Sequence, residues 1–307
     1  VVGIVEQKDA NEDQLAITEV NTGIMAMPTD YLNEWLPQLS SDNAQGEYYL
    51  TDLIAMAAES GVTVQALHPT SEFEVQGVNN RRQLADLERW YQLQQANAAM
   101  DAGVTLADPA RFDVRGQLTV GQDSQIDVNF IAEGEVTIGS NVVIGPNCVV
   151  KNSIIGDGVE ILANTHMTVQ YADACQLGPF ARIRPGSKLE TGVKVGNFVE
   201  TKKALVGKGS KLNHLSYIGD ANIGEEVNVG AGTITCNYDG VNKSLTEIGD
   251  RAFIGSNSSL VAPVQVGAGS TIGAGSTITS KVEEDQLSVA RGKQRNISGW
   301  KRPVKKG

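Results

Sequence analysis

The chain has 307 residues, of which 41% are hydrophobic and only 5% aromatic, and its formal net charge is −11. The length is sufficient for two domains, whereas the acidic balance argues against a nucleic-acid binder, which needs a basic face. No long apolar run occurs, so we expect no membrane span, and the opening VVGIVE (1–6) lacks the features of a signal peptide.

The first hundred residues carry helical patterns and no glycine-rich phosphate loop. Thr29 or Asp30 is expected to cap a short helix that runs through Tyr31 and Trp35 to Leu36. Further along, we expect a second helix around 49–56, a buried strand over 62–67 and a long helix over 79–102. This alternation favours an α/β layer.

The long helix is expected to present one apolar face to a core. That face would be formed by Leu84, Leu87, Trp90, Tyr91 and Leu93.

From about Val120 to Thr279 the dominant signal is a period of six. The clearest run of aliphatic anchors is Ile248, Ile254, Leu260, Val266, Ile272 and Ile278, and glycine follows four of them at Gly249, Gly255, Gly267 and Gly273. Six matches neither a helical face nor strand alternation. It predicts a hexapeptide-repeat parallel β-helix with the anchors inside and glycine helping the chain to turn each corner.

Upstream registers continue this ladder and break where a residue is lost or a loop leaves the coil. They are 120, 126, 132, 138, 144, 150; 155, 161, 167; 177, 183, 189, 195, 201; 206, 212, 218; and 223, 229, 235. The longest interruption, from Cys236 to Glu247, carries the sequence NYDG (237–240).

Three widely spaced cysteines, Cys148, Cys175 and Cys236, are typical of reduced thiols and fit neither a disulfide framework nor a zinc site. We therefore expect a cytoplasmic protein.

Several motifs resemble the bacterial bifunctional family of N-acetylglucosamine-1-phosphate uridyltransferases / glucosamine-1-phosphate N-acetyltransferases. In the repeat half they are GNFVE (196–200) followed by two lysines, NHLSYIGD (213–220) and NVGAGTITCNYDG (228–240). In the front half they are GIVE (3–6), EVNTG (19–23), NAQGEYYLTD (43–52) and GVNNR (77–81). The resemblance covers essentially the whole chain.

The resemblance implies three parts. Residues 1–78 would be the C-terminal part of an α/β uridyltransferase domain, 79–103 a linker helix, and 104–307 a left-handed β-helix acetyltransferase domain with a C-terminal tail. The family's glycine-rich loop and acidic metal ligand are missing here, and the chain opens like the interior of a longer protein. We therefore expect an N-terminally truncated copy that does not complete uridylyl transfer.

The implied activity is acetyl transfer from acetyl-CoA to glucosamine-1-phosphate, for peptidoglycan and lipopolysaccharide synthesis. His214 would be the general base, since an imidazole suits proton abstraction near neutrality; by itself a lone histidine is more often structural, as we expect for His68 and His166. The sugar phosphate would be bound by Arg184, Lys202, Tyr217, Asn228 and Lys243. The alternative for these cations is solvated surface charge.

Acetyl-CoA would contact Ala231, Asn237, Tyr238, Ser256, Ala274 and Arg291. The alternative is that the small residues are needed only for the corners of the coil, and the Asn-Tyr-Asp-Gly segment only for a turn. In the front half, Gly3, Glu6, Asn21 and Asn79 would touch UTP or UDP-N-acetylglucosamine, with Asn79 also binding Mg²⁺, although one amide oxygen is a poor site for that cation.

The family further implies a homotrimer with its site between neighbouring prisms. Two alternatives stay open: another hexapeptide acyltransferase with a different acceptor, and a non-catalytic β-helix such as a scaffold or ice-binding surface. A scaffold should show uniform exposed ladders and no loop with His, Asn and Tyr, whereas this chain carries such a loop.

Overall fold

A computed structural model describes residues 1–169, 173–303 and 305. The chain divides into two compact units, Val1–Glu88 and Arg89–Gly307. Within the described residues, no helix is long and apolar enough to cross a membrane. The helices are α1 (Glu12–Leu15), α2 (Thr29–Trp35), η1 (Leu36–Gln38), α3 (Asp52–Glu59), η2 (Glu72–Glu74), α4 (Arg81–Asp101) and η3 (Pro109–Arg111).

The first unit has a small core in which Trp35, Leu53 and Ala57 are buried. The predicted helices form as α2 and α3, but neither Thr29 nor Asp30 is the cap of α2, because the helix begins directly after Pro28, which has no capping side chain. The strand expected over 62–67 is absent, and residues 1–88, all of which are described, contain only helices and loops.

The long helix α4 forms, but the prediction of its apolar face is only partly correct, since Leu87 and Trp90 alone of the five residues are half-buried. Leu84, Tyr91 and Leu93 are exposed, whereas Gln92 and Ala96 are the buried residues. Gln92 is buried because its amide donates to the Val114 carbonyl at 2.9 Å and accepts from the Val114 N–H at 2.7 Å. The polar side chain thus satisfies a strand edge of the first coil, which an apolar residue could not do.

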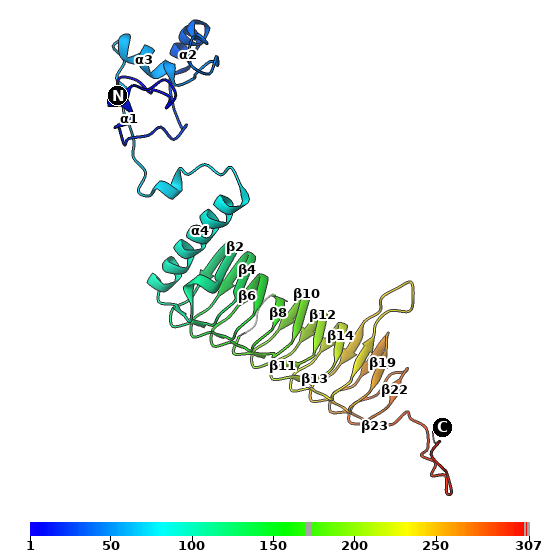
Figure 1. The fold of residues 1–307 in the computed structure, drawn as a ribbon. Helices are drawn as coiled ribbons and strands as arrows, with labels where there is room; N and C mark the ends of the chain where they lie inside the picture. The colour runs from blue at the N-terminus through cyan, green and yellow to red at the C-terminus, as the bar shows by residue number, and fades with distance from the viewer. Residues whose placement is uncertain (170–172, 304, 306–307) are drawn as a thin grey trace. The chain divides into compact units, whose positions relative to one another are not determined.

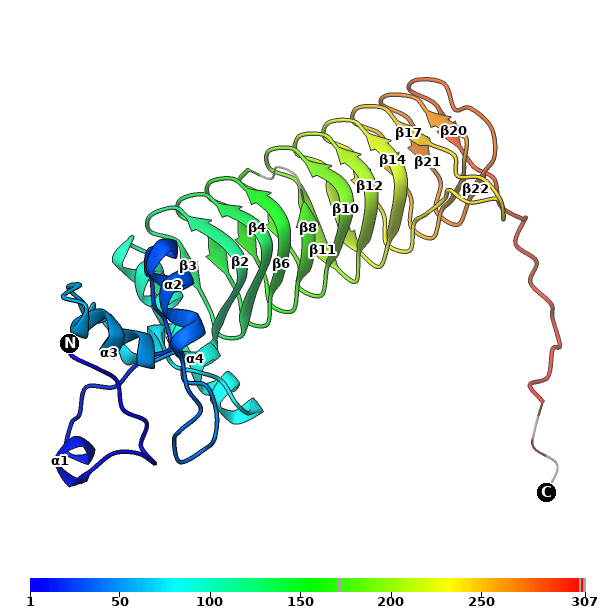
Figure 2. The ribbon, with the colours of Figure 1, turned by 90° about the horizontal axis from the view of Figure 1, so that it is seen from above.

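The second unit is the left-handed parallel β-helix that hexapeptide repeats form (Figures 1 and 2). One sheet contains β1 (Thr105–Leu106), β3 (Gln125–Ile126), β5 (Val143–Ile144), β7 (Glu160–Ile161), β9 (Gln176–Leu177), β11 (Lys194–Asn197), β13 (Lys211–His214), β15 (Asn228–Val229), β18 (Phe253–Ile254), β21 (Thr271–Ile272) and β23 (Leu287–Ser288). Both ends of the coil therefore lie beyond the predicted limits.

The other sheet is bent. It contains β2 (Phe112–Val120), β4 (Phe130–Ile138), β6 (Val149–Ile155), β8 (His166–Val169), β10 (Arg182–Leu189), β12 (Glu200–Val206), β14 (Tyr217–Ile223), β16 (Ile234–Cys236), β17 (Thr246–Ile248), β19 (Ser259–Val261), β20 (Val264–Val266) and β22 (Thr277–Ile278). Within its long strands, residues such as Asn152, Lys203 and Asp220 have positive φ and turn the chain. These corners coincide with predicted breaks in the period of six.

Three faces therefore surround the coil. Face 1 is the first sheet; face 2 contains 182–184, 200–202, 217–219 and 234–236; face 3 contains 187–189, 204–206, 221–223 and 246–248. Every predicted anchor is buried except Val120, which is partly buried against the core. Neighbouring coils stack in register, as Ile254 does on Ile272. Burying each such side chain contributes roughly 1.5–3 kcal/mol.

The glycines after the anchors have a different role from the one predicted. Gly255 and Gly267 do not have positive φ; instead, a Cβ at either would lie 2.5 Å from a backbone nitrogen of the next coil, that of Ala274 or Glu284. These glycines are needed for close approach of successive coils. Positive φ is provided by other corner residues, such as Gly158 and Asn164.

The predicted loop is present between β16 and β17. It projects from the coil as a hairpin with an antiparallel bridge between Tyr238 and Lys243 (Figure 1). The Asp239 carboxylate accepts from the N–H groups of Val241 and Asn242, at 2.8 and 2.6 Å, and so stabilises the turn. These bonds also hold the pKa of Asp239 below its usual value.

Candidate active site

The candidate base lies at the corner between faces 1 and 2. His214 is the last residue of β13, and Asn197, the last residue of β11, is its partner in the parallel register. His214 is exposed, and its Nδ1 lies 3.1 Å from the Asn197 Oδ1. The buried Ser216 hydroxyl donates to the His214 carbonyl at 2.8 Å and fixes the backbone behind the imidazole.

A column of small residues continues along this corner in successive coils. The Leu215 carbonyl, next to His214, accepts from Gly232 N–H at 3.0 Å. The Ala231 carbonyl then accepts from Asn257, at 2.7 Å, and the Ser256 carbonyl from Gly275, at 2.8 Å. The Arg291 guanidinium donates to the Ala274 carbonyl at 2.8 Å. Four of the six residues predicted to contact acetyl-CoA, namely Ala231, Ser256, Ala274 and Arg291, therefore form one line that starts beside His214.

Three of the predicted sugar-phosphate residues form a positive cluster at the end of face 2 that is opposite the His214 corner. Arg184 and Lys202 lie on β10 and β12, and Lys243 lies on the projecting loop. The close contact with Lys243 and its charge lower the pKa of Lys202 most; desolvation and then the charge of Arg184 lower it further, while Asp220 opposes this effect. Three cations that approach one another closely enough to perturb a pKa are suited to bind a polyanion.

Two carboxylates hold this cluster in place. Glu200 Oε1 accepts from Arg184 Nη1 at 2.7 Å across neighbouring strands. Asp220 Oδ2 accepts from the side-chain amide of Asn237, the first residue of the loop, which is 7% exposed. Asn237 therefore fixes the base of the loop that carries Lys243. The other predicted loop residue, Tyr238, donates its hydroxyl to Gly240 O at 2.6 Å.

Tyr217 lies on face 2 between the base and the cations. A Cβ at Gly219 would be 2.5 Å from the Tyr217 hydroxyl, so the phenol ring lies directly over this glycine. Lys202 is the register partner of Gly219, and Glu200 is that of Tyr217. Asn228 is half-buried on face 1, in β15 beside β13.

The four front residues are not joined in the same way. No hydrogen bond or ion pair connects any two of Gly3, Glu6, Asn21 and Asn79, all of which are described. The Asn21 side chain accepts from Gly23 N–H at 3.2 Å, and Asn79 N–H donates to Gln83 at 2.8 Å. Among the described residues no cluster of three acidic, His or Cys side chains could hold a metal. Asn79 alone does not fit Mg²⁺, which requires several oxygen ligands.

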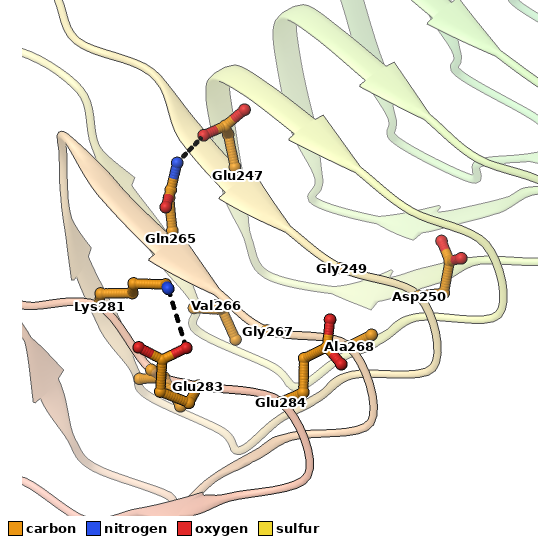
Figure 3. A pocket seen from close by; sticks show the side chains of 11 residues that line it. Glu247, Gly249, Asp250, Gln265, Val266, Gly267, Ala268, Lys281, Glu283 and Glu284 are labelled. Carbon is orange, nitrogen blue, oxygen red and sulfur yellow. Dashed lines mark hydrogen bonds and ion pairs between the residues drawn. The ribbon is translucent and has the colours of Figure 1, made fainter.

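Four further residues lie beside the predicted ones, although no role was predicted for them: Asn197, Glu200, Asp220 and Gly219. All four lie inside the motifs 196–200 and 213–220, but only the register between coils shows which side chains meet. A hollow of about 400 Å³ lies elsewhere, beside the last coils (Figure 3). Its carboxylates include Glu247, bonded to Gln265, and Glu283, paired with Lys281. None of the predicted site residues lines it.

The coil matches known sequence families. Residues 245–280 match the bacterial transferase hexapeptide (six repeats), and residues 135–168 match the hexapeptide repeat of succinyl-transferase. Among solved structures, the polysialic acid-specific acetyltransferase NeuO aligns with 66% of this chain and 87% of its own at 19% identity, with a TM-score of 0.25. LpxA from Acinetobacter baumannii aligns with 62% and 70% at 17% identity, with a TM-score of 0.27. The repeat matches define the chain as a hexapeptide-repeat transferase.

Similarity over the whole of this chain identifies the family more specifically than the repeat matches do. The bifunctional protein GlmU of Marinobacter nauticus is 62% identical over 306 residues, which are 99% of this chain and 67% of that protein. The GlmU proteins of Idiomarina loihiensis and Cellvibrio japonicus are 61% and 62% identical over the whole chain, covering 67% and 68% of their own lengths. The chain belongs to the bifunctional GlmU family.

Proposed function

We propose that the β-helix transfers an acetyl group from acetyl-CoA to the amine of glucosamine-1-phosphate. The observation that carries this proposal is that a corner histidine and a cluster of three cations flank the same face of the coil. A substrate with an amine at one end and a phosphate at the other matches both features. Tyr217, between them, would hydrogen-bond the sugar, and Asn228 would do so from face 1.

His214 would remove one proton from the amine nitrogen as that nitrogen attacks the thioester carbon. The new C–N bond forms, the C–S bond breaks, and coenzyme A leaves as a thiolate that takes up a proton. Arg184, Lys202 and Lys243 would bind the phosphate by charge-assisted hydrogen bonds. The column from Ala231 to Arg291 would accommodate the slender pantetheine arm along the corner, and Asn237 and Tyr238 would contact acetyl-CoA from the loop.

Free thiol released from acetyl-CoA in the presence of glucosamine-1-phosphate would test the proposal. Glucosamine without phosphate and galactosamine-1-phosphate serve as matched acceptors. Arg184→Ala should raise KM for the sugar phosphate with little change in kcat, because it removes binding made in both ground and transition states. An equal rate with glucosamine would contradict a role for the cations and favour another hexapeptide acyltransferase. No thiol release with any acceptor would favour a scaffold.

The family is bifunctional, and we propose that residues 1–78 belong to its uridyltransferase part, 79–103 to a linker helix and 104–307 to the acetyltransferase part. Gly3, Glu6, Asn21 and Asn79 would then contact the UDP-sugar within the longer protein. Mg²⁺ would be required there, but the described residues do not complete a site for it. Dependence of UDP-N-acetylglucosamine formation on Mg²⁺ in a full-length relative would test this assignment.

We also propose a cytoplasmic homotrimer. All three cysteines are free, as expected in a reducing compartment. Phe180, Phe198 and Leu215 are 50–61% exposed at one corner, and the two phenyl rings stack with centroids 5.4 Å apart. Apolar side chains in this position would pack against a neighbouring coil. Analytical ultracentrifugation that shows an active monomer would contradict the trimer.

A further inference from the structure

We propose that Asn197 is a positioning residue for His214: it holds the proton on Nδ1 and leaves Nε2 free to take the proton of the amine. The inference rests on the proposed acetyl transfer, in which His214 is the base. No role for the Asn197 side chain follows from the sequence motifs. Three features support the inference: the strand register, the local backbone, and the hydrogen-bonding chemistry of an amide beside an imidazole.

The backbone presents the two side chains to each other. Asn197 and His214 are register partners at the ends of β11 and β13, and Leu215 N–H donates to the Asn197 carbonyl at 3.1 Å. The next residue in each coil, Phe198 or Leu215, has a φ of +57° or +48°. Bulky residues rarely adopt this left-handed conformation. The chain therefore turns immediately after each member of the pair, and both side chains stay at the corner.

The position of Asn197 is not explained by the corner alone. Asparagines at the equivalent corners of earlier coils, Asn129, Asn147 and Asn164, themselves have positive φ, which asparagine tolerates. Their three side chains form a ladder, with Asn129 Nδ2 donating to Asn147 Oδ1 at 2.8 Å and Asn147 Nδ2 donating to Asn164 Oδ1 at 3.3 Å. Asn197 stands one residue before the left-handed position, which Phe198 occupies. Its amide is thus not needed to make the turn.

The chemistry of the contact determines the tautomer. The Asn197 Oδ1, 3.1 Å from Nδ1 of His214, is a carbonyl oxygen that only accepts hydrogen bonds. The bond therefore exists only when Nδ1 carries the proton, and a neutral imidazole then has its lone pair on Nε2. An imidazole needs its second nitrogen fixed by such a partner in order to act as an oriented base. Here a neutral amide provides the acceptor.

The tautomer can be measured without any assay of activity. The chain has only three histidines, His68, His166 and His214, so ¹⁵N-imidazole NMR can resolve the signals of each ring. The signals that disappear in His214→Gln are those of His214. We expect a protonated Nδ1 for His214 in the wild type and a proton mainly on Nε2 in Asn197→Ala. Asn197→Asp, which retains an acceptor oxygen, should keep the wild-type tautomer. An unchanged tautomer in Asn197→Ala would overturn the inference.

Kinetics provide the second readout. Asn197→Ala should lower kcat by about 10–100-fold, the usual effect of losing a residue that orients a functional imidazole, with KM for both substrates nearly unchanged. Asn197→Asp should recover most of the activity. Gln176→Ala is the matched control, because Gln176 also bonds a side chain of the previous coil, Glu160 Oε2, at 2.7 Å; it should retain wild-type kcat.

The two proposals fail differently. If His214→Ala keeps wild-type turnover, the base role and the proposed mechanism are wrong. If His214→Ala is inactive while Asn197→Ala has normal kcat, only the positioning role is wrong. A loss of kcat in Asn197→Ala that is matched by Gln176→Ala would indicate a general effect on the coil and would also overturn it.

Discussion

The side-chain amide of Asn237 donates to the carboxylate of Asp220 in the preceding coil, and this bond ties the base of the loop that carries Lys243 to that coil. Because Asn237 is almost completely buried, water does not readily replace the lost partner. The contact joins the loop to the corner at the end of face 2, the face on which Lys202 lies. The arrangement of the cation cluster therefore depends on a carboxylate that need not touch the substrate.

Asp220→Ala should consequently weaken substrate binding. A hydrogen bond to a charged group contributes about 1.5–3 kcal/mol, so we expect KM for the sugar phosphate to rise roughly 10–100-fold if the loop is released. Asp220→Asn retains an acceptor and should show a smaller rise. Steady-state kinetics of both variants test this expectation, and an unchanged KM in Asp220→Ala would show that the loop keeps its place without the bond.

His214→Ala should lower kcat for acetyl transfer by about 10²–10⁴-fold, the usual contribution of a general base. Acetyl-CoA affinity, measured by calorimetry, should change little, because the imidazole is assigned to proton transfer. Part of the lost rate should return at high pH, where more of the sugar amine is already neutral. A flat deficit across the pH range would instead indicate that the histidine positions a substrate.

Two kinds of glycine should differ in their response to alanine. At Gly267 a Cβ would lie 2.5 Å from the Glu284 nitrogen, and rigid backbone cannot move aside easily. At Gly158 no atom lies within 4 Å of the added Cβ, but φ is +64°, a conformation that destabilises an alanine by about 1–2 kcal/mol. Thermal unfolding should show a larger loss for Gly267→Ala. Equal losses would contradict the close-approach explanation.

The sequence predicted the coil well because its signal is local and periodic. Ile254 and Ile272 must face inward for the coils to stack, and the six-residue spacing of the aliphatic anchors between them is visible in the sequence itself. The reasons for glycine, by contrast, lie in the neighbouring coil: Gly255 meets Ala274, nineteen residues away. Helix α4 was misjudged for the same reason, since Gln92 is buried by a strand edge that its own amphipathic pattern does not reveal.

In the candidate site, too, local sequence motifs identified residues, whereas contacts between coils could not be predicted. The resemblance indicated His214, Lys202 and Lys243, but their mutual placement depends on register. Asn197 meets His214 only because β11 and β13 pair in one particular alignment. For Arg184, the partner Glu200 likewise lies on the next strand. Lost residues at coil corners shift the spacing between such pairs, so sequence separation alone could not identify them.

Cysteine reactivity should separate the buried thiols from the accessible one. Burial raises the pKa of Cys148 and raises that of Cys175 to about 11, so both remain protonated at pH 8, and only a thiolate reacts rapidly. Cys236 is partly exposed on face 2. We expect a thiol reagent to label Cys236 alone in the folded protein and all three after unfolding. Rapid labelling of two or more native thiols would contradict this burial pattern.

The pairing of Lys202 with Lys243 has a measurable consequence for pH. Contact with Lys243 holds the pKa of Lys202 below the ordinary value of 10.5. As pH rises, Lys202 therefore loses its positive charge earlier than an isolated lysine would, and affinity for the sugar phosphate should begin to fall at a correspondingly lower pH.

Lys243→Met removes the largest cause of that shift, so the pKa of Lys202 should return towards 10.5. Binding should then be weaker at neutral pH, because one cation is lost, but its decline should move to higher pH. Lys208→Met, on a corner outside the cluster, provides the control and should reproduce the wild-type profile. Calorimetric titration with glucosamine-1-phosphate over an alkaline pH series measures both effects. A decline at the same pH in wild type and Lys243→Met would show that the two ammonium groups do not interact, and the cluster would then not act as a single phosphate site.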